Sequence, residues 1–268
     1  MTPHSRISVS STIDSVTILQ KAAKMAKKFN LPFCNTVDKC STELILAYTE
    51  KGLQLLHSST NRNKLFSLLA VDFVHGKNGY RRAKNCTIKQ PFARAAGIKS
   101  GVRPTILDAT AGLGSDAFVL ASLGCTVTMI ERSPLIAAIL EDGMDRALEH
   151  KRTEEIIKNR MCLQCGDTIK LLRTLQETFQ TIYLDPMYPH KSGSALNKQA
   201  MRTIRNLVGD DTDAGLLLDI ALTKAQDRVV VKRPQNAPLL SKSKPSHTIT
   251  MKNSRFDIYL TFKSRLSG

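Results

Sequence analysis

Tryptophan is absent from this chain of 268 residues, and aromatic side chains make up only 5% of it. No apolar run reaches the roughly 18 residues that a membrane-spanning helix needs, and the N-terminus lacks the apolar core of a signal peptide. We therefore expect a soluble, cytoplasmic protein with no membrane partner. The length suits one well-buried domain with a smaller appendage, because single cores stop growing near about 250 to 300 residues.

Cysteine is sparse and scattered, and a chain of this size does not need disulfides to stabilise its core. Reduced thiols are the simple interpretation. Cys162 and Cys165 have the CxxC spacing of half a zinc site, but no second pair of soft ligands follows at a similar spacing. We predict no bound metal. The six positions are Cys34, Cys40, Cys86, Cys125, Cys162 and Cys165.

Acidic residues are outnumbered, with 23 Asp and Glu against 39 Lys and Arg, which leaves a formal charge of +16. Such a surface favours phosphate-rich partners, because Lys and Arg release condensed counterions when they bind a polyanion. Nucleic acid is therefore the leading partner class. A basic surface can also serve solubility or attraction to a membrane surface.

The first part of the chain predicts a small α+β module over residues 1–80. Residues 14–29 have apolar positions at helical spacing, with Asp14 placed to cap the helix and Asn30 to end it. Two strand-like runs on either side of Glu50 to Gly52 then predict a hairpin. The stretch "HGKNGYRRAKN" is rich in Gly and positive charge. It predicts that residues 81–103, which begin within it, form a basic linker or entry segment.

Residues 104–268 alternate short β-rich runs with longer helical ones, which is typical of a mostly parallel sheet with helices on both faces. The last two strands have no room for a helix between them, so they should pair antiparallel. The predicted fold class is therefore α/β. The seven strand candidates are 105–107, 126–130, 161–163, 181–184, 228–231, 247–251 and 257–262.

A glycine-containing turn follows the first of these strands, in "TILDATAGLGSDAF". Gly112 and Gly114 allow close approach of a ligand to the backbone, and the helix that Ser115 and Asp116 begin offers free N–H groups. The second strand ends on Glu131, 19 residues after Gly112. This is close to the spacing of about 20 residues at which an acid accepts hydrogen bonds from a ribose.

The acidic residues of this turn indicate which nucleotide cofactor it suits. Asp108 and Asp116 would repel a pyrophosphate, whereas S-adenosylmethionine carries an amine and a ribose but no phosphate. We therefore predict S-adenosylmethionine; the alternative is that Asp108 only caps a turn. Asp167, with Thr168 just after it, could accept from the adenine amino group, although an acid there is more often a helix N-cap.

The stretch "YLDPMYPHK" places Asp185, Pro186 and Tyr188 where the fourth strand of this sheet ends. Open α/β sheets bind ligands at that edge. The exocyclic amine of a base is a poor nucleophile, and acceptors such as the Asp185 carboxylate and the Pro186 carbonyl can orient it. Tyr188 offers a face on which a base can stack. The alternative is a buried tyrosine and a proline that only ends a strand.

Together with "LDATAGLGSDAFVLASLGC", "VVVKRP" and "RFDIY", this stretch resembles the bacterial ribosomal RNA small-subunit methyltransferase J family over about residues 70 to 260. The resemblance implies S-adenosylmethionine-dependent methylation of a guanine N2 in small-subunit ribosomal RNA, free or in the assembled subunit. It also implies a class I methyltransferase (Rossmann-like) sheet of order 3-2-1-4-5-7-6. Implied cofactor contacts are Ser115, Asp116, Glu131, Arg132, Asp167, Thr168 and Asp185. Ser115 stands where an Arg is common in the family, and Asp167 with Thr168 stands where the family has two small hydroxyl residues. The resemblance therefore supports these three contacts less than those of Glu131 and Asp185.

Basic residues in the segments around the proposed site predict an RNA-facing surface, although the same residues could form an ordinary solvated face. Two other functions remain open from the sequence: an amino-methyltransferase acting on DNA adenine or a protein amide, and a non-catalytic RNA-binding protein that retains the fold. The predicted RNA-facing residues are Arg81, Arg82, Lys191, Lys232 and Arg233.

Overall fold

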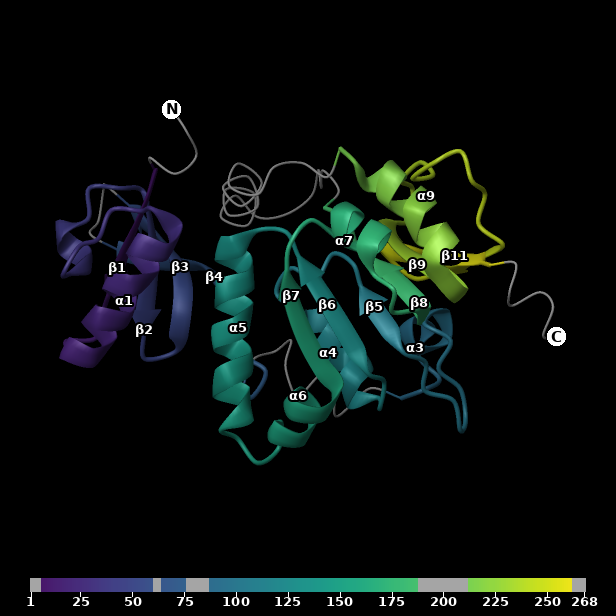
Figure 1. The fold of residues 1–268 in the computed structure, drawn as a ribbon, viewed down its shortest axis with the longest axis horizontal. Coiled ribbons are helices and arrows are strands. Elements are labelled where there is room, and N and C mark those ends of the chain that lie inside the picture. Colours follow the sequence, from purple (N-terminus) through teal and green to yellow (C-terminus); the bar gives the residue numbers. More distant parts are fainter. Residues whose placement is uncertain (1–5, 60–63, 76–86, 188–211, 262–268) are drawn as a thin grey trace. The chain divides into compact units, whose positions relative to one another are not determined.

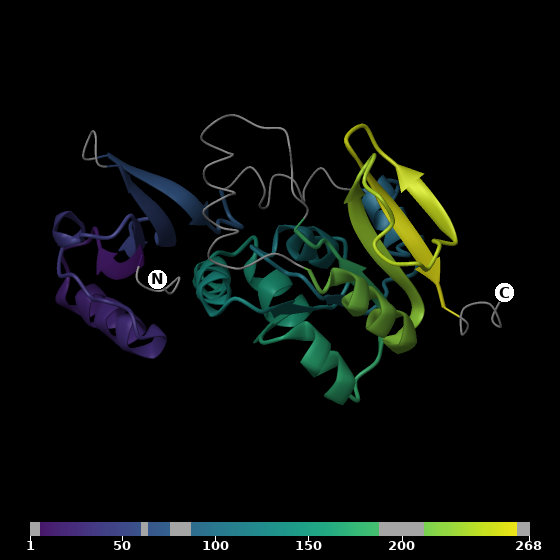
Figure 2. The ribbon, with the colours of Figure 1, turned by 90° about the horizontal axis from the view of Figure 1, so that it is seen from above.

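The computed structural model describes residues 6–59, 64–75, 87–187 and 212–261. These residues form two compact units (Figures 1 and 2). The first contains the described residues up to Asp72 together with Ala138–Arg146, and the second contains the rest. The predicted boundary at residues 80 and 81 lies outside the described residues.

The N-terminal unit is a four-stranded sheet with a helix on it, in agreement with the predicted α+β module. The sheet order is β1-β2-β3-β4; β1 is parallel to β2, and the other pairs are antiparallel. Helix α1 packs against β1 and β2 and buries Ala22 and Ala26. Its elements are β1 (Ile7–Ser11), α1 (Val16–Phe29), a 3-10 turn (Val37–Lys39), β2 (Leu44–Thr49), β3 (Gly52–Ser59) and β4 (Lys64–Ala70).

The ends of α1 confirm one prediction and correct another. Asn30 ends the helix in the left-handed conformation, with φ 53°, as its side chain type favours. Asp14 is not the cap: the N-cap residue is Ser15, and no side chain accepts a capping hydrogen bond there. The hairpin between β2 and β3 turns at Glu50 to Gly52 as predicted.

The second unit is a seven-stranded sheet of order β10-β11-β9-β8-β5-β6-β7. Numbered from β5 and listed from the β7 edge, this is the order 3-2-1-4-5-7-6 that the resemblance implies. All pairs are parallel except those of β11, which is antiparallel to β9 and β10. The strands are β5 (Ile106–Asp108), β6 (Val127–Glu131), β7 (Met161–Cys165), β8 (Phe179–Leu184), β9 (Ala225–Pro234), β10 (His247–Thr250) and β11 (Ser254–Leu260).

Helices cover both faces of this sheet. Ile182 and Leu184 of β8 share one buried cluster with α7 and α9, while Tyr183 points to the other face, where its ring lies 5.2 Å from that of Phe92 on α3. This alternation follows from the two-residue period of a strand. The helices of this unit are α3 (Pro91–Ala95), α4 (Ser115–Ser122), α6 (Glu154–Arg160), α7 (Thr168–Thr174) and α9 (Ala214–Lys224). A further helix, α5 (Pro134–Leu148), is divided between the two units, because its residues 138–146 belong to the first.

The topology brings four strand ends to one edge. β5 lies between β6 and β8, so the chain reverses its winding direction beside β5, at the switch point where such sheets bind ligands. β9 continues past the end of β8: Leu184 pairs with Val231, which places Lys232 next to Asp185. Asp108 and Glu131 end the two strands on the other side of the switch point.

Candidate active site

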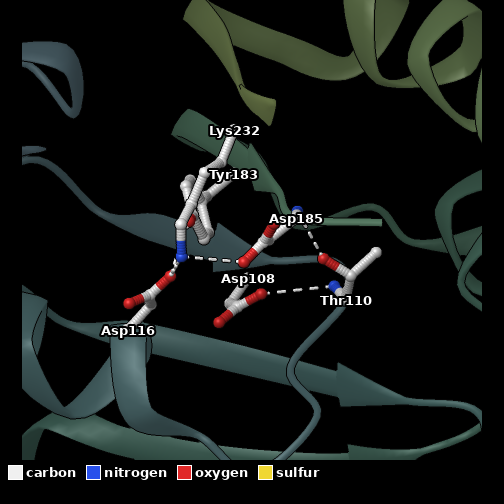
Figure 3. Close-up of polar contacts among 6 residues, drawn as sticks. All are labelled: Asp108, Thr110, Asp116, Tyr183, Asp185 and Lys232. Carbon is white, nitrogen blue, oxygen red and sulfur yellow. Dashed lines mark hydrogen bonds and ion pairs between the residues drawn. The ribbon is translucent and has the colours of Figure 1, made fainter. Parts of the chain in front are cut away.

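A network of polar side chains lies at this edge of the sheet (Figure 3). The Lys232 ammonium contacts Asp116 Oδ2 at 2.7 Å and Asp185 Oδ2 at 2.9 Å. The Tyr183 hydroxyl donates to the same oxygen of Asp116 at 2.6 Å. The network therefore joins β8, the first turn of α4 and β9 through side chains that are far apart in sequence.

The network stabilises the charge on Lys232. Burial alone would lower the pKa of this ammonium, but the adjacent Asp185 and Asp116 carboxylates raise it above its usual range. Burial, followed by the charges of Asp116 and Asp185, raises the pKa of the Tyr183 hydroxyl well above its usual value. Tyr183 thus remains a neutral donor and Lys232 a cation at physiological pH.

The main chain of Asp185 is fixed from the turn after β5. Its N–H donates to Thr110 Oγ1 at 2.7 Å. Thr168, at the start of α7, donates its hydroxyl to the Ala109 carbonyl at 2.8 Å. Pro186 is buried, whereas the Asp185 side chain is 39% exposed. Asp185 therefore combines a constrained backbone with a carboxylate that solvent can reach.

Asp108 is a carboxyl group that burial keeps protonated. It is 1% exposed and accepts a hydrogen bond from the Thr110 N–H at 3.2 Å. Burial, with added repulsion from Asp116, Asp185 and Glu131, raises its pKa from 3.8 to about 8. A large fraction of Asp108 is therefore neutral at pH 7.

This shift predicts how Asp108→Asn changes stability with pH. A carboxyl whose pKa is higher in the folded than in the unfolded state stabilises the fold at low pH and loses that contribution as pH rises, here from about 4 to about 8. Asparagine resembles the neutral acid and has no such titration. We expect the parent's melting temperature to fall relative to that of the variant between pH 5 and pH 8, as measured by scanning calorimetry. If the melting temperatures of the parent and Asp108→Asn changed in parallel with pH, the raised pKa of Asp108 would be contradicted. The control is Asp219→Asn, which changes an exposed acid.

Glu131 fixes the glycine turn. It is 6% exposed, and its carboxylate accepts from the Gly112 N–H at 2.8 Å and the Ser133 N–H at 2.7 Å. Gly112 and Gly114 have φ of 55° and 69°, values that favour glycine. No atom lies within 4 Å of where a Gly112 Cβ would stand, so the turn borders open space. Ser115 begins α4 directly after this turn.

The remaining predicted cofactor residues have structural partners. Asp167 is the N-cap of α7 and accepts from the Lys170 N–H at 3.1 Å, as the alternative in the sequence analysis anticipated. Arg132 forms an ion pair with Asp213 at 3.3 Å. Thr168 is buried under the turn that follows β5. These contacts leave their predicted roles toward a cofactor as predictions.

Comparison with known proteins decides the family. A family model described as "Putative SAM-dependent methyltransferase" matches residues 15–261. A Desulfotalea psychrophila protein named ribosomal RNA small subunit methyltransferase J is 50% identical over 244 residues, which cover 91% of this chain and 92% of the relative. A Pseudomonas aeruginosa protein of the same name is 44% identical over 248 residues, covering 91% and 92%. The chain belongs to the methyltransferase J family.

A solved structure agrees with a methyltransferase fold. A crystal structure of an S-adenosylmethionine-dependent methyltransferase from Neisseria gonorrhoeae matches with a TM-score of 0.66 and 28% identity, over 95% of this chain and 96% of the other. The protein is thus an S-adenosylmethionine-dependent methyltransferase, and the predicted cofactor and fold class are confirmed.

The residues of this methyltransferase J chain fit that cofactor. The open space beside Gly112 admits a ligand next to the backbone, and Glu131 lies directly behind the turn. The carboxylates of Asp116 and Asp185 would disfavour a phosphate but suit the positive charges of S-adenosylmethionine. The acidic side chains at this edge therefore match a cationic nucleoside better than a dinucleotide.

Two of the predicted RNA-facing residues, Lys232 and Arg233, lie among the described residues. Lys232 is bound between two carboxylates. Arg233 is 4% exposed and donates to the Pro238 carbonyl at 2.9 Å. Their contact with RNA stays a prediction. Four further predicted site residues lie outside the described residues: Arg81, Arg82, Tyr188 and Lys191.

Sequence reasoning missed two members of the network, Thr110 and Tyr183. Tyr183 has a recognisable signal, because a tyrosine two residues before Asp185 on a strand points to the same face. No signal identifies Thr110, since a threonine in a turn usually bonds locally.

The described residues contain neither a candidate metal-binding cluster nor a candidate membrane-spanning helix. In that part of the chain, no cluster of three or more His, Cys, Asp or Glu side chains could bind a metal ion. Among the same residues, no helix has both the length and the apolar character needed to span a membrane.

Proposed function

We propose that this enzyme methylates the exocyclic N2 of a guanine in small-subunit (16S) ribosomal RNA, in the cytoplasm. The observation that carries the proposal is the position of Asp185 and Pro186, at the carboxyl end of β8 and beside the glycine turn. The names of its relatives support ribosomal RNA as the substrate. The formal charge of +16 supports binding of a polyanion.

For the cofactor, we assign the ribose to Glu131. The N–H groups of Gly112 and Ser133 fix the Glu131 carboxylate beside the glycine turn, and carboxylate oxygens accept hydrogen bonds from ribose hydroxyls. Gly112, Gly114 and Ser115 supply backbone at close approach. The adenine is assigned to Asp167 and Thr168, and the amino-acid portion to Asp108, Asp116, Arg132 and Asp185. When bound, S-adenosylmethionine supplies a methyl group activated by a sulfonium.

The target amine is assigned to Asp185 and the Pro186 carbonyl. The nitrogen lone pair of guanine N2 is delocalised into the ring, so attack requires acceptors that favour a pyramidal nitrogen and align it. The Asp185 carboxylate also stabilises the positive charge that develops on nitrogen during attack. Tyr188 would stack on the flipped base.

The deciding experiment maps methyl groups on RNA. Small-subunit RNA from cells lacking the gene should accept a methyl group from the purified protein at one guanine N2, and the same nucleotide should be unmethylated in those cells. Free RNA and assembled small subunits are compared as substrates. Incorporation into DNA or protein but not into RNA would favour the other amino-methyltransferase function. Binding of RNA without transfer to any substrate would favour a non-catalytic role.

A further inference from the structure

The side-chain network around Asp185 contains a residue whose role the reaction alone does not define. Lys232 contacts Asp185 and Asp116, and Asp116 also accepts from Tyr183. Lys232, Asp116 and Asp185 have side-chain exposures of 31%, 26% and 39%. The contact between the Lys232 ammonium and Asp185 Oδ2, at 2.9 Å, limits the rotamers of this partly exposed carboxylate. Lys232 therefore restricts a side chain that the proposed reaction needs in one orientation.

We propose that Lys232 is a positioning residue for methyl transfer, which orients the Asp185 carboxylate and maintains it in the ionised form. This inference rests on the proposed function of Asp185. Three elements converge on the contact: β9 supplies the ammonium, α4 supplies Asp116 as its second anchor, and β8 supplies Tyr183, which fixes Asp116 (Figure 3). The Thr110 hydroxyl fixes the Asp185 backbone separately.

The charges around Asp185 explain why ionisation needs a cation. Among the described residues, titratable groups that interact with it include Lys232 on β9, Asp116 on α4, Tyr183 on β8 and Asp108 at the end of β5. Three of these four groups are acids. Without Lys232, the Asp185 and Asp116 carboxylates would repel each other, and one of them would retain its proton to higher pH.

A purely structural ion pair would give a different result. If Lys232 only connected β9 to α4, its removal would lower the melting temperature and leave the pH dependence of the rate unchanged. A positioning role predicts that the acid limb of the rate profile moves, because the fraction of ionised Asp185 at a given pH falls.

The test measures single-turnover methylation of small-subunit RNA from cells lacking the gene, between pH 5.5 and 9. In Lys232→Met we expect an acid limb about one pH unit higher, because an adjacent cation lowers the pKa of a carboxyl by about that amount or more. We also expect a plateau rate about tenfold lower, because the carboxylate loses the contact that orients it. Lys232→Arg should restore the limb. If the Met variant unfolds, Lys232→Gln, which also lacks the charge, should show the same shift.

The control is Lys151→Met, which removes the same charge from an exposed lysine of the second unit; its acid limb should stay near that of the parent. An unshifted limb in a folded Lys232→Met or Lys232→Gln variant would overturn the inference. A parent that transfers no methyl group to this RNA would instead overturn the proposed function.

A second inference concerns the N-terminal unit, for which the reaction supplies no role. Helix α1 presents four exposed lysines on the face opposite its buried Ala22 and Ala26, at the spacing of one helical side: Lys21, Lys24, Lys27 and Lys28. The helix has no acidic residue, and none of these lysines forms an ion pair with a described residue.

Local helix energetics accounts for only part of this pattern. Lys27 and Lys28 lie in the last turn, where cations interact favourably with the helix dipole. Lys21 and Lys24 lie in the middle of the helix and gain nothing from it. Like charges three and four residues apart repel one another, so the lysine face destabilises the isolated helix. An anionic partner would reverse that cost.

We infer that this lysine face, Lys21, Lys24, Lys27 and Lys28 on α1, binds the phosphate backbone of the RNA substrate. The occupant follows from charge complementarity between a cationic helix face and a polyanion, and the inference rests on RNA as the substrate. Ammonium groups on flexible stems bind phosphates without reading sequence, so the face would increase affinity for any ribosomal RNA segment that reaches it.

The experiment compares two double variants that remove the same charge. Lys21→Gln with Lys24→Gln should weaken binding of small-subunit RNA and lower the slope of log affinity against log salt by about one to two units, roughly one for each lost phosphate contact. Lys151→Gln with Lys158→Gln, which changes exposed lysines of the second unit, should keep the slope of the parent. Glutamine preserves helix propensity, so α1 should remain folded.

The quadruple variant of the lysine face should lower the slope further, while cofactor affinity and the rate at saturating RNA stay near those of the parent. A slope equal to that of the Lys151 and Lys158 control would overturn this inference and leave the proposed reaction intact. Failure of the parent itself to bind or methylate the RNA would contradict the proposed function.

Discussion

Asp185→Asn is expected to slow methyl transfer at least about tenfold, which corresponds to a barrier increase of about 1.4 kcal/mol or more. Asparagine preserves the size of the side chain and one acceptor oxygen. That oxygen can still accept a hydrogen bond from the Lys232 ammonium, which in the parent lies 2.9 Å from Asp185 Oδ2. It loses the negative charge that favours developing positive charge on the target nitrogen. The effect should therefore appear in the single-turnover rate on small-subunit RNA.

Two controls separate this loss from unfolding. Asp219→Asn removes the same charge from an exposed position on α9 and should transfer methyl groups at the parent's rate. The melting temperature of Asp185→Asn should stay near that of the parent, because the backbone of residue 185 is fixed by Thr110. The variant should still bind S-adenosylmethionine, whose ribose is assigned to Glu131. Parental rates in the variant would exclude Asp185 from catalysis, and a collapsed melting temperature would assign it a structural role.

The part of the site that the sequence predicts is the part built from local signals. A strand end, two glycines and a following helix identify the turn, and an acid at the next strand end identifies Glu131. In the structure, the Glu131 carboxylate accepts from Gly112 itself at 2.8 Å, so the spacing of 19 residues reflects a direct contact. These features depend on one β-α-β unit, within which chain distance and spatial distance are closely related.

The position of Lys232 depends on pairing between distant strands and could not be predicted. Whether a lysine near the end of β9 faces RNA or the active site is decided by the register of β9 against β8, where Val231 pairs with Leu184. A shift of one residue would move Lys232 to the other face of the sheet. Hydrophobic pattern identifies both strands but does not determine how far one extends past the other.

Strand β1 was missed because its buried residues are partly polar. The sequence "ISVSS" lacks the run of apolar side chains expected of a fully buried strand, yet all five residues are buried. Hydrogen bonds compensate: Ser8 Oγ lies 2.6 Å from Thr42 Oγ1, and Ser10 donates to the Cys34 carbonyl at 3.0 Å. Burial of a serine is inexpensive once its hydroxyl has a partner, and the partners lie 34 and 24 residues away.

Glu131→Ala should weaken S-adenosylmethionine binding by at least about tenfold, or about 1.4 kcal/mol. The substitution removes the proposed ribose acceptor, and it also leaves the N–H groups of Gly112 and Ser133 without the carboxylate that fixes the turn. An unsatisfied buried donor costs about 1 to 3 kcal/mol, and these two N–H groups are part-buried, so the melting temperature should fall by part of that cost. Affinity is therefore measured by calorimetry well below the melting temperature of the variant.

Glu131→Gln separates the two effects of that substitution, because its amide oxygen can still accept from one backbone N–H, while its NH2 group cannot accept from a ribose hydroxyl. We expect a melting temperature between those of the parent and Glu131→Ala, with cofactor affinity nearly as low as in the alanine variant. If the glutamine variant bound the cofactor as tightly as the parent, Glu131 would serve only to shape the turn. Tight binding of NAD by the parent would contradict the assignment of the pocket, since the Asp116 and Asp185 carboxylates should repel a pyrophosphate there.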